Sequence, residues 1–100
     1  MIKHIILWTL KDEFSDAEKA KIKASIKTGL EGLKDKIPEI AEIKVYTEHL
    51  ASSTADLMLD STFSSEDDLK AYAKHPDHQE VANTRVRPFV ANRSCLDFEI

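Results

Sequence analysis

The first ten residues alternate between two faces and contain no turn-forming residue. One face carries Ile2, His4, Ile6, Trp8 and Leu10, and the other carries Lys3, Ile5, Leu7 and Thr9. A repeat of two residues is typical of a β-strand. The pattern predicts a strand over residues 2–10, and both of its faces bear large apolar side chains.

The next segment changes to the spacing of a helix. Ser15 and Glu18 form a capping-box pair, in which each side chain can bond the backbone amide of the other. The apolar residues that follow are spaced by three or four and form one stripe: Ile22, Ile26, Leu30, Leu33 and Ile37. This spacing predicts a helix over residues 15–36 that ends before Pro38.

The rest of the chain predicts three more strands and two short helices. The strands are expected at residues 41–50, 55–63 and 94–100, with a polar turn at 51–54. A helix opens at Ser64 or Ser65 and runs to about residue 73, and another starts near His75 and runs to about residue 86. The order is strand, helix, strand, strand, helices, strand. It predicts an α+β, ferredoxin-like domain over residues 1–100: a four-stranded antiparallel sheet with its helices on one face.

This architecture leaves one apolar sheet face without a cover. Trp8 is expected under the helices, whereas Ile5, Leu7 and Met58 are expected on the opposite face. A large exposed apolar face usually has a partner, so the sequence predicts a homodimer with the two sheets packed face to face.

Chain length, net charge and cysteine count restrict the possible classes of partner and the cellular location. The chain has 100 residues, a net charge of −4 and a single cysteine, Cys95. One domain is expected at this length. The acidic balance argues against nucleic acid as a partner, and a lone cysteine favours a cytoplasmic location. The apolar run from Ile5 to Trp8 is too short for a membrane span, and charged residues follow it at once, so no signal peptide and no membrane contact are expected.

The candidate chemistry lies in the stretch YAKHPDHQE, residues 72–80. His78 is expected to be the third residue of a helix, where the dipole disfavours the imidazolium, so that a neutral His78 could act as a base. Tyr72 would lie one tight turn away, with its hydroxyl available to an oxyanion. The simpler alternatives are that His75 only caps the helix, that His78 bonds a buried backbone group or His4, and that Tyr72 is a core residue. No metal is expected, because His75 acts as a cap and no third ligand is evident.

Three segments resemble the stress-responsive A/B barrel (Dabb) family: HIILWTLKD, LKAYAKHPDHQEV and CLDFE. The resemblance implies a dimeric α+β barrel with a cavity between sheet and helices, and a plant polyketide (olivetolic acid) cyclase is among its members. It implies that His78 and Tyr72 stand at the positions of the catalytic base and its partner, and that His4 is a pocket histidine. The other residues that it places around the cavity are Trp8, Leu59 and Phe89.

Two positions depart from the cyclase pattern. Leu57 stands where the cyclase branch has another pocket histidine, and Leu30 stands where it has a tyrosine on the first helix. These changes make the expected pocket more apolar. The resulting hypothesis is a small-molecule pocket, with proton abstraction by the His78–Tyr72 pair in a cyclase- or lyase-like reaction that needs no cofactor. The alternative is a non-catalytic ligand-binding or stress-protective dimer.

Overall fold

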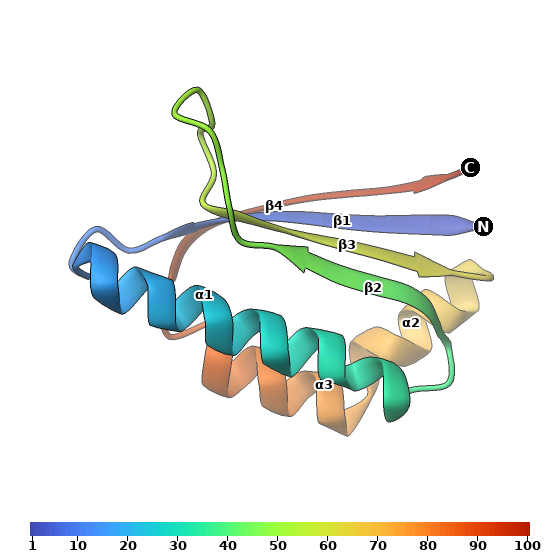
Figure 1. The fold of residues 1–100 in the computed structure, drawn as a ribbon. Helices are drawn as coiled ribbons and strands as arrows, with labels where there is room; N and C mark the ends of the chain where they lie inside the picture. Colours follow the sequence, from blue (N-terminus) through green and yellow to red (C-terminus); the bar gives the residue numbers. More distant parts are fainter.

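The computed structural model describes all residues 1–100 and has two layers (Figure 1). One layer is a four-stranded antiparallel sheet of strand order β2-β3-β1-β4. The other layer is made of the helices, which all lie on one face of that sheet (Figure 1). The predicted fold class is therefore confirmed.

The elements follow the predicted order. The strands are β1 (Ile2–Leu10), β2 (Ile40–Tyr46), β3 (Leu57–Phe63) and β4 (Val90–Glu99). The helices are α1 (Asp16–Glu31), α2 (Glu66–Lys74) and α3 (Pro76–Val81). A 3-10 turn, Gly32–Asp35, extends α1, and a π-helical turn, Ala82–Val86, extends α3.

Local chemistry explains why α1 begins where it does. The Glu18 amide donates to the Ser15 hydroxyl at 3.2 Å, and the Ser15 amide donates to the Glu18 carboxylate at 2.9 Å. The predicted capping box is thus present. Gly29, farther along α1, allows close packing, because a Cβ there would meet the side chain of Arg85 at 2.7 Å.

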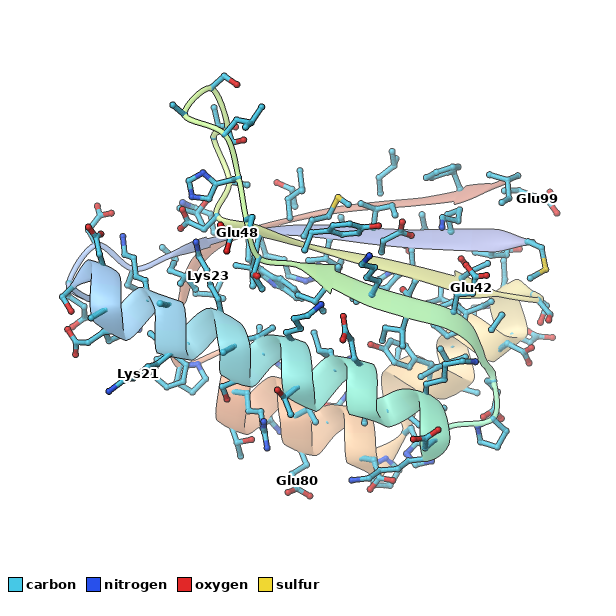
Figure 2. The ribbon with its side chains drawn as sticks, in the orientation of Figure 1. Lys21, Lys23, Glu42, Glu48, Glu80 and Glu99 are labelled. Atoms are coloured by element: carbon cyan, nitrogen blue, oxygen red, sulfur yellow. The ribbon has the colours of Figure 1, made fainter.

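The core lies between the sheet and the helices. Ile6, Trp8 and Leu10 of β1 are nearly fully buried, as the alternation predicts. They pack with the α1 stripe in one cluster that also contains Leu59 and Phe63 of β3. Surface side chains such as Lys21 and Glu80 point away from the sheet (Figure 2).

The other sheet face is not covered by any helix. Leu7, Tyr46 and Phe98 are each about two-fifths exposed there, and Leu96 is 62% exposed. Beside them, Lys3 forms an ion pair with Asp60 at 2.6 Å. We call this side, which also carries Ile5 and Met58, the outer face.

Strand boundaries differ from the prediction most at β2 and β4, and β3 begins at Leu57 rather than at residue 55. β2 ends at Tyr46 rather than residue 50, because the chain then leaves the sheet in a loop that projects beyond it (Figure 1). β4 begins at Val90 rather than Ser94 and pairs with β1 as far as Leu10. Its polar residues Asn92 and Arg93 conceal this start in the sequence, because an edge strand left uncovered by helices does not need apolar residues.

The edge formed by β2 is partly closed by α1. At Val45, the backbone amide donates to Glu31 at 2.9 Å and the carbonyl accepts from Lys27 at 2.8 Å. Lys27 and Glu31 also form an ion pair at 2.7 Å. Two helix side chains thus take the place of a neighbouring strand at this point.

Candidate functional site

The junction between α2 and α3 positions the candidate site. Ser65 caps α2 by accepting from the Asp68 amide at 3.1 Å, and α2 ends at Lys74. Pro76 has no amide hydrogen and keeps the residue before it extended, so His75 adopts a ψ of 134°. The His75 side chain then accepts from the Asp77 amide at 3.1 Å, which confirms that His75 caps α3.

His78 faces back toward the end of α2. Its Nδ1 lies 3.2 Å from the carbonyl oxygen of Ala73. Because a carbonyl can only accept a hydrogen bond, Nδ1 carries the hydrogen and Nε2 keeps its lone pair. Burial lowers the pKa of His78 below its ordinary value. The hydrogen bond to Ala73 raises this pKa, whereas the charges of His4 and Arg87 lower it further. The imidazole is therefore neutral at pH 7, and burial is the largest cause.

Tyr72 lies at the centre of an aromatic cluster. Its ring centroid is 4.3 Å from that of His78, 5.0 Å from that of Phe63 and 6.3 Å from that of His4. Its hydroxyl is buried and has no hydrogen-bond partner. Burial also raises the pKa of Tyr72 above its ordinary value, so the phenol is protonated. A buried donor without a partner is costly in a folded protein and is a feature that a ligand oxygen would satisfy.

His4 completes the group from β1. Its Nδ1 lies 2.5 Å from a carboxylate oxygen of Asp97 and 3.9 Å from the sulfur of Cys95. Burial, followed by the hydrogen bond to Asp97, raises the pKa of the Cys95 thiol. In the sequence, Cys95 and Asp97 belong to the segment CLDFE, but nothing there links them to His4. Only the register between β1 and β4 brings them to His4.

The remaining predicted pocket residues do not surround this group. Trp8, Leu30 and Leu59 are at most 5% exposed and belong to the packed core, as does Leu57. Phe89 lies near the opposite end of β1, where its carbonyl accepts from the Lys11 amide and its ring packs on Phe14. The structure brings His78, Tyr72 and His4 together, but it leaves the predicted apolar lining either packed or distant.

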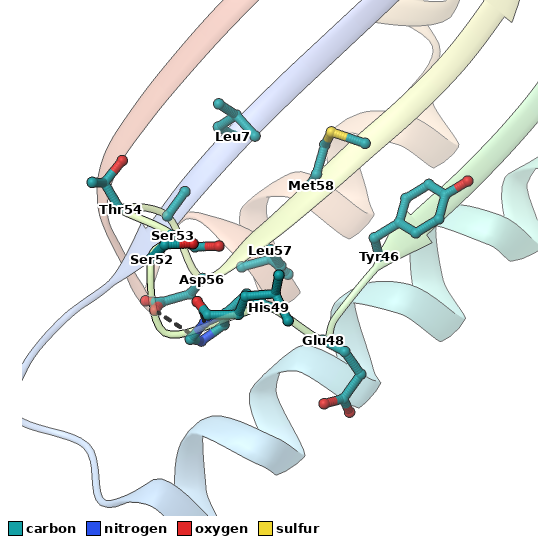
Figure 3. Close-up of a pocket in the computed structure, with 12 residues that line it drawn as sticks. Leu7, Tyr46, Glu48, His49, Ser52, Ser53, Thr54, Asp56, Leu57 and Met58 are labelled. Carbon is teal, nitrogen blue, oxygen red and sulfur yellow. Dashed lines mark hydrogen bonds and ion pairs between the residues drawn. The ribbon is translucent and has the colours of Figure 1, made fainter.

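Two open hollows flank the sheet. One, of about 800 Å³, lies at the helix side and is walled by His4, Asp97, Leu69 and Ala73, among others. Neither Tyr72 nor His78 is part of its wall. The other, of about 810 Å³, lies at the outer face between Leu7, Tyr46, Met58 and the β2–β3 loop (Figure 3). His49 of that loop approaches Asp56 at 3.9 Å (Figure 3).

Comparison with known proteins decides the family. The family model described as the Stress responsive A/B Barrel Domain (Dabb) matches residues 2–100. This chain is a Dabb domain.

Similar proteins fit this assignment. The Dabb domain is 33% identical over 101 residues to a stress-response A/B barrel domain-containing protein of Arabidopsis thaliana, an alignment that covers 98% of the chain and 36% of that protein. The chain thus spans about a third of the length of this curated relative.

Solved structures share the fold. One is described as a dimeric protein of unknown function with a ferredoxin-like fold from Bacteroides fragilis: its TM-score is 0.93 at 33% identity, over 99% of the Dabb domain and 95% of that chain. Another is the hydroxynitrile lyase from Passiflora edulis, with a TM-score of 0.75 at 22% identity over 99% and 92% of the two chains. At that identity the similarity shows the fold alone.

The arrangement in this Dabb domain supplies the parts of an acid–base site. His78 offers a neutral nitrogen with a free lone pair, and Tyr72 offers a protonated hydroxyl without a partner. The apolar surroundings strengthen the effect of such a donor on a developing negative charge. His4 adds a third polar group at the sheet side of Tyr72.

Proposed function

We propose that this Dabb domain binds a small carbonyl or hydroxyl compound and that the His78–Tyr72 pair transfers a proton on it. The observation that carries the proposal is the buried Tyr72 hydroxyl, which has no partner and lies against a histidine that burial keeps neutral. A base and a donor held against each other in an apolar site are suited to removing a proton next to a carbonyl.

The proposed step balances without a cofactor. His78 Nε2 takes a proton from the carbon beside the carbonyl, and the electron pair of that C–H bond moves onto the carbonyl oxygen. The Tyr72 hydroxyl donates a hydrogen bond to the resulting enolate. The enolate then attacks a second carbonyl in an aldol-type cyclisation, and His78 returns its proton to the alkoxide oxygen that this attack forms. Alternatively, the enolate carbon takes the proton back from His78. In a lyase reaction, His78 instead takes the proton of a hydroxyl group, and the O–H electron pair forms the new carbonyl bond. The electron pair of the adjacent carbon–carbon bond leaves with the departing carbanion, which takes the proton from His78.

Access sets a condition on the substrate. Tyr72 is 1% exposed, so its hydroxyl is sealed from solvent. A ligand must displace side chains around Tyr72 to reach it, and the open hollow walled by His4 offers one route from solvent. The packed core around Trp8, Leu30 and Leu59 favours a small ligand over a polyketide chain.

Hydrogen–deuterium exchange tests the proposal across a whole class of carbonyl compounds. In D₂O, we expect the wild-type protein to accelerate exchange at the carbon next to the carbonyl in a panel of small ketones and 1,3-diketones, followed by NMR. A cyanohydrin in the same panel tests lyase chemistry. His78→Ala should abolish the effect, and Tyr72→Phe should reduce it by about 10²–10³-fold, as loss of one oxyanion donor does elsewhere.

His49→Ala is the matched control, because His49 lies in the β2–β3 loop. It should leave exchange unchanged. Exchange no faster than in buffer across the panel, or a His78→Ala variant as active as the wild type, would contradict the proposal.

A non-catalytic ligand-binding or stress-protective dimer is the second candidate. The observation that favours it is the sealed Tyr72 hydroxyl together with the closely packed core. In this case some compounds of the same panel should bind and shift the amide resonances of residues around Tyr72. The protein should not accelerate hydrogen–deuterium exchange at the carbon atoms of these compounds. His78→Ala would then leave binding intact.

We further infer that the domain works as a homodimer joined through its outer face. The apolar side chains exposed there support this assembly, as does the Bacteroides fragilis structure, which is described as dimeric. The free, exposed thiol of Cys95 suits a reducing compartment such as the cytoplasm.

A further inference from the structure

A cluster of three metal-ligating side chains lies where β1 meets β4. His4 and Asp97 are directly opposite each other in the ladder, and Cys95 lies diagonally from His4 on the same face. The Cys95 sulfur is 3.5 Å from the Asp97 carboxylate and 3.9 Å from His4 Nδ1, and that Nδ1 is 2.5 Å from Asp97. An imidazole nitrogen, a thiol and a carboxylate oxygen therefore converge within 4.8 Å of one another.

We propose that His4, Cys95 and Asp97 bind a divalent transition-metal ion of the Zn²⁺ class. These three donor types are the ones that zinc uses in proteins. A thiolate ligand favours borderline or soft ions, whereas Mg²⁺ and Ca²⁺ prefer oxygen ligands alone. Sequence spacing does not reveal the cluster, because His4 and the Cys95–Asp97 pair lie at opposite ends of the chain.

The observed spacing is close to what such an ion requires. In a tetrahedral zinc site, neighbouring nitrogen, oxygen and sulfur ligands lie roughly 3.3–3.6 Å apart. The 3.5 Å and 3.9 Å distances from Cys95 are near this range, so only the His4–Asp97 pair must open. The Asp97 side chain is 45% exposed and free to turn, while His4 is 12% exposed and is held among the core aromatics.

The position also suits exchange of the ion with solvent. Cys95 and Asp97 are exposed on the edge strand, and Asp97 and His4 wall an open hollow. Three protein ligands leave one coordination position for water or for a bound molecule. The site uses neither His78 nor Tyr72, so it stands whether or not that pair transfers a proton.

Cobalt spectroscopy tests the proposal directly. Tag-free protein, kept reduced with a phosphine, is titrated with Co²⁺. We expect a thiolate-to-cobalt charge-transfer band that saturates at one equivalent per chain and is lost when Zn²⁺ is added. Because the chain has a single cysteine, the band can come only from Cys95.

The variants separate the site from adventitious binding. Cys95→Ser should abolish the band, and Asp97→Asn and His4→Gln should each weaken Co²⁺ binding about tenfold or more. Asp97→Asn is the safer of the two for folding, because Asp97 is exposed, and circular dichroism checks both variants. His49→Gln, a histidine near a different aspartate, should leave the titration unchanged.

Three results would overturn the proposal. The first is the absence of a charge-transfer band at stoichiometric cobalt. The second is saturation at half an equivalent per chain, which indicates an ion shared by the thiols of two copies. The third is wild-type affinity in folded Asp97→Asn and His4→Gln proteins.

Discussion

The protonation of His78 is the residue-scale property on which the proposed chemistry depends. Burial disfavours its charged form, so its pKa in the folded chain lies below the ordinary value of 6.5. We expect an NMR titration of the four histidine rings to give His78 a midpoint below 6.5, with His78→Gln identifying the signal. The same ring in urea-unfolded protein should return to the ordinary value. A folded-state midpoint at or above 6.5 would contradict the burial argument.

The lowered pKa of His78 also determines how the stability of the folded chain changes with pH. Between the folded-state pKa and 6.5, the unfolded chain binds a proton at His78 that the folded chain does not. The contribution of His78 to stability is therefore fully present above pH 6.5 and is lost as the pH falls through the folded-state pKa. His78→Gln should flatten this part of the pH–stability curve, measured by urea unfolding.

At the same scale, local spacing predicted part of the candidate site and could not predict the rest. His75, His78 and Tyr72 lie within seven residues, so a proline-started helix is enough to place them near each other. Cys95 and Asp97 depend on the pairing of β1 with β4, which joins residues more than 90 apart. Nothing local specifies that register. The apolar lining was predicted by resemblance, and the closed packing of Trp8 and Leu30 does not provide it.

At the scale of elements, the start of α3 depends on one side chain. His75 accepts from the Asp77 amide, which would otherwise lack a partner in the first turn. His75→Ala should lower the free energy of unfolding by about 1 kcal/mol, whereas His75→Asn should retain most of it, because asparagine is a good cap. Urea unfolding measures both. Equal stability of the alanine variant and the wild type would show that the cap contributes nothing.

The spacing of apolar residues and the capping residues of the helices explain why the helices and strands could be predicted from the sequence. Each strand shows the two-residue repeat on at least part of its length, and Ser15, Ser65 and Pro76 mark the helix starts. The largest errors in strand boundaries fall at β2 and β4, the two edges of the sheet. Edge strands pack on fewer neighbours, so the apolar pattern in the sequence marks their first and last residues less clearly.

At the scale of the whole molecule, the outer face is the surface through which we propose that two copies join. Leu7 stands at its centre, opposite Met58 of β3 and Ser94 of β4. Leu7→Asp would bury a charge without a partner in a dimer, so we expect it to dissociate the dimer to monomers in sedimentation velocity at micromolar concentration.

Lys21→Asp is the control for this experiment, because Lys21 points away from the sheet on α1 (Figure 2). It should leave the dimer intact. A wild-type protein that sediments as an 11.3 kDa monomer would contradict assembly through this face.

None of the helices combines the length and the apolar content that a bilayer-spanning helix requires.

The contact of α1 with Val45 bears on how the domain resists aggregation. An exposed strand edge is a template on which another chain can add a strand, and repeated addition leads to cross-β fibres. On β2, Lys27 and Glu31 occupy the backbone groups that an incoming strand would use. On β4, the charged side chains Arg93, Asp97 and Glu99 make the edge unsuitable for a hydrophobic strand. Edge-to-edge polymerisation is thus disfavoured at both sides of the sheet, while its outer face stays free for contact between two copies.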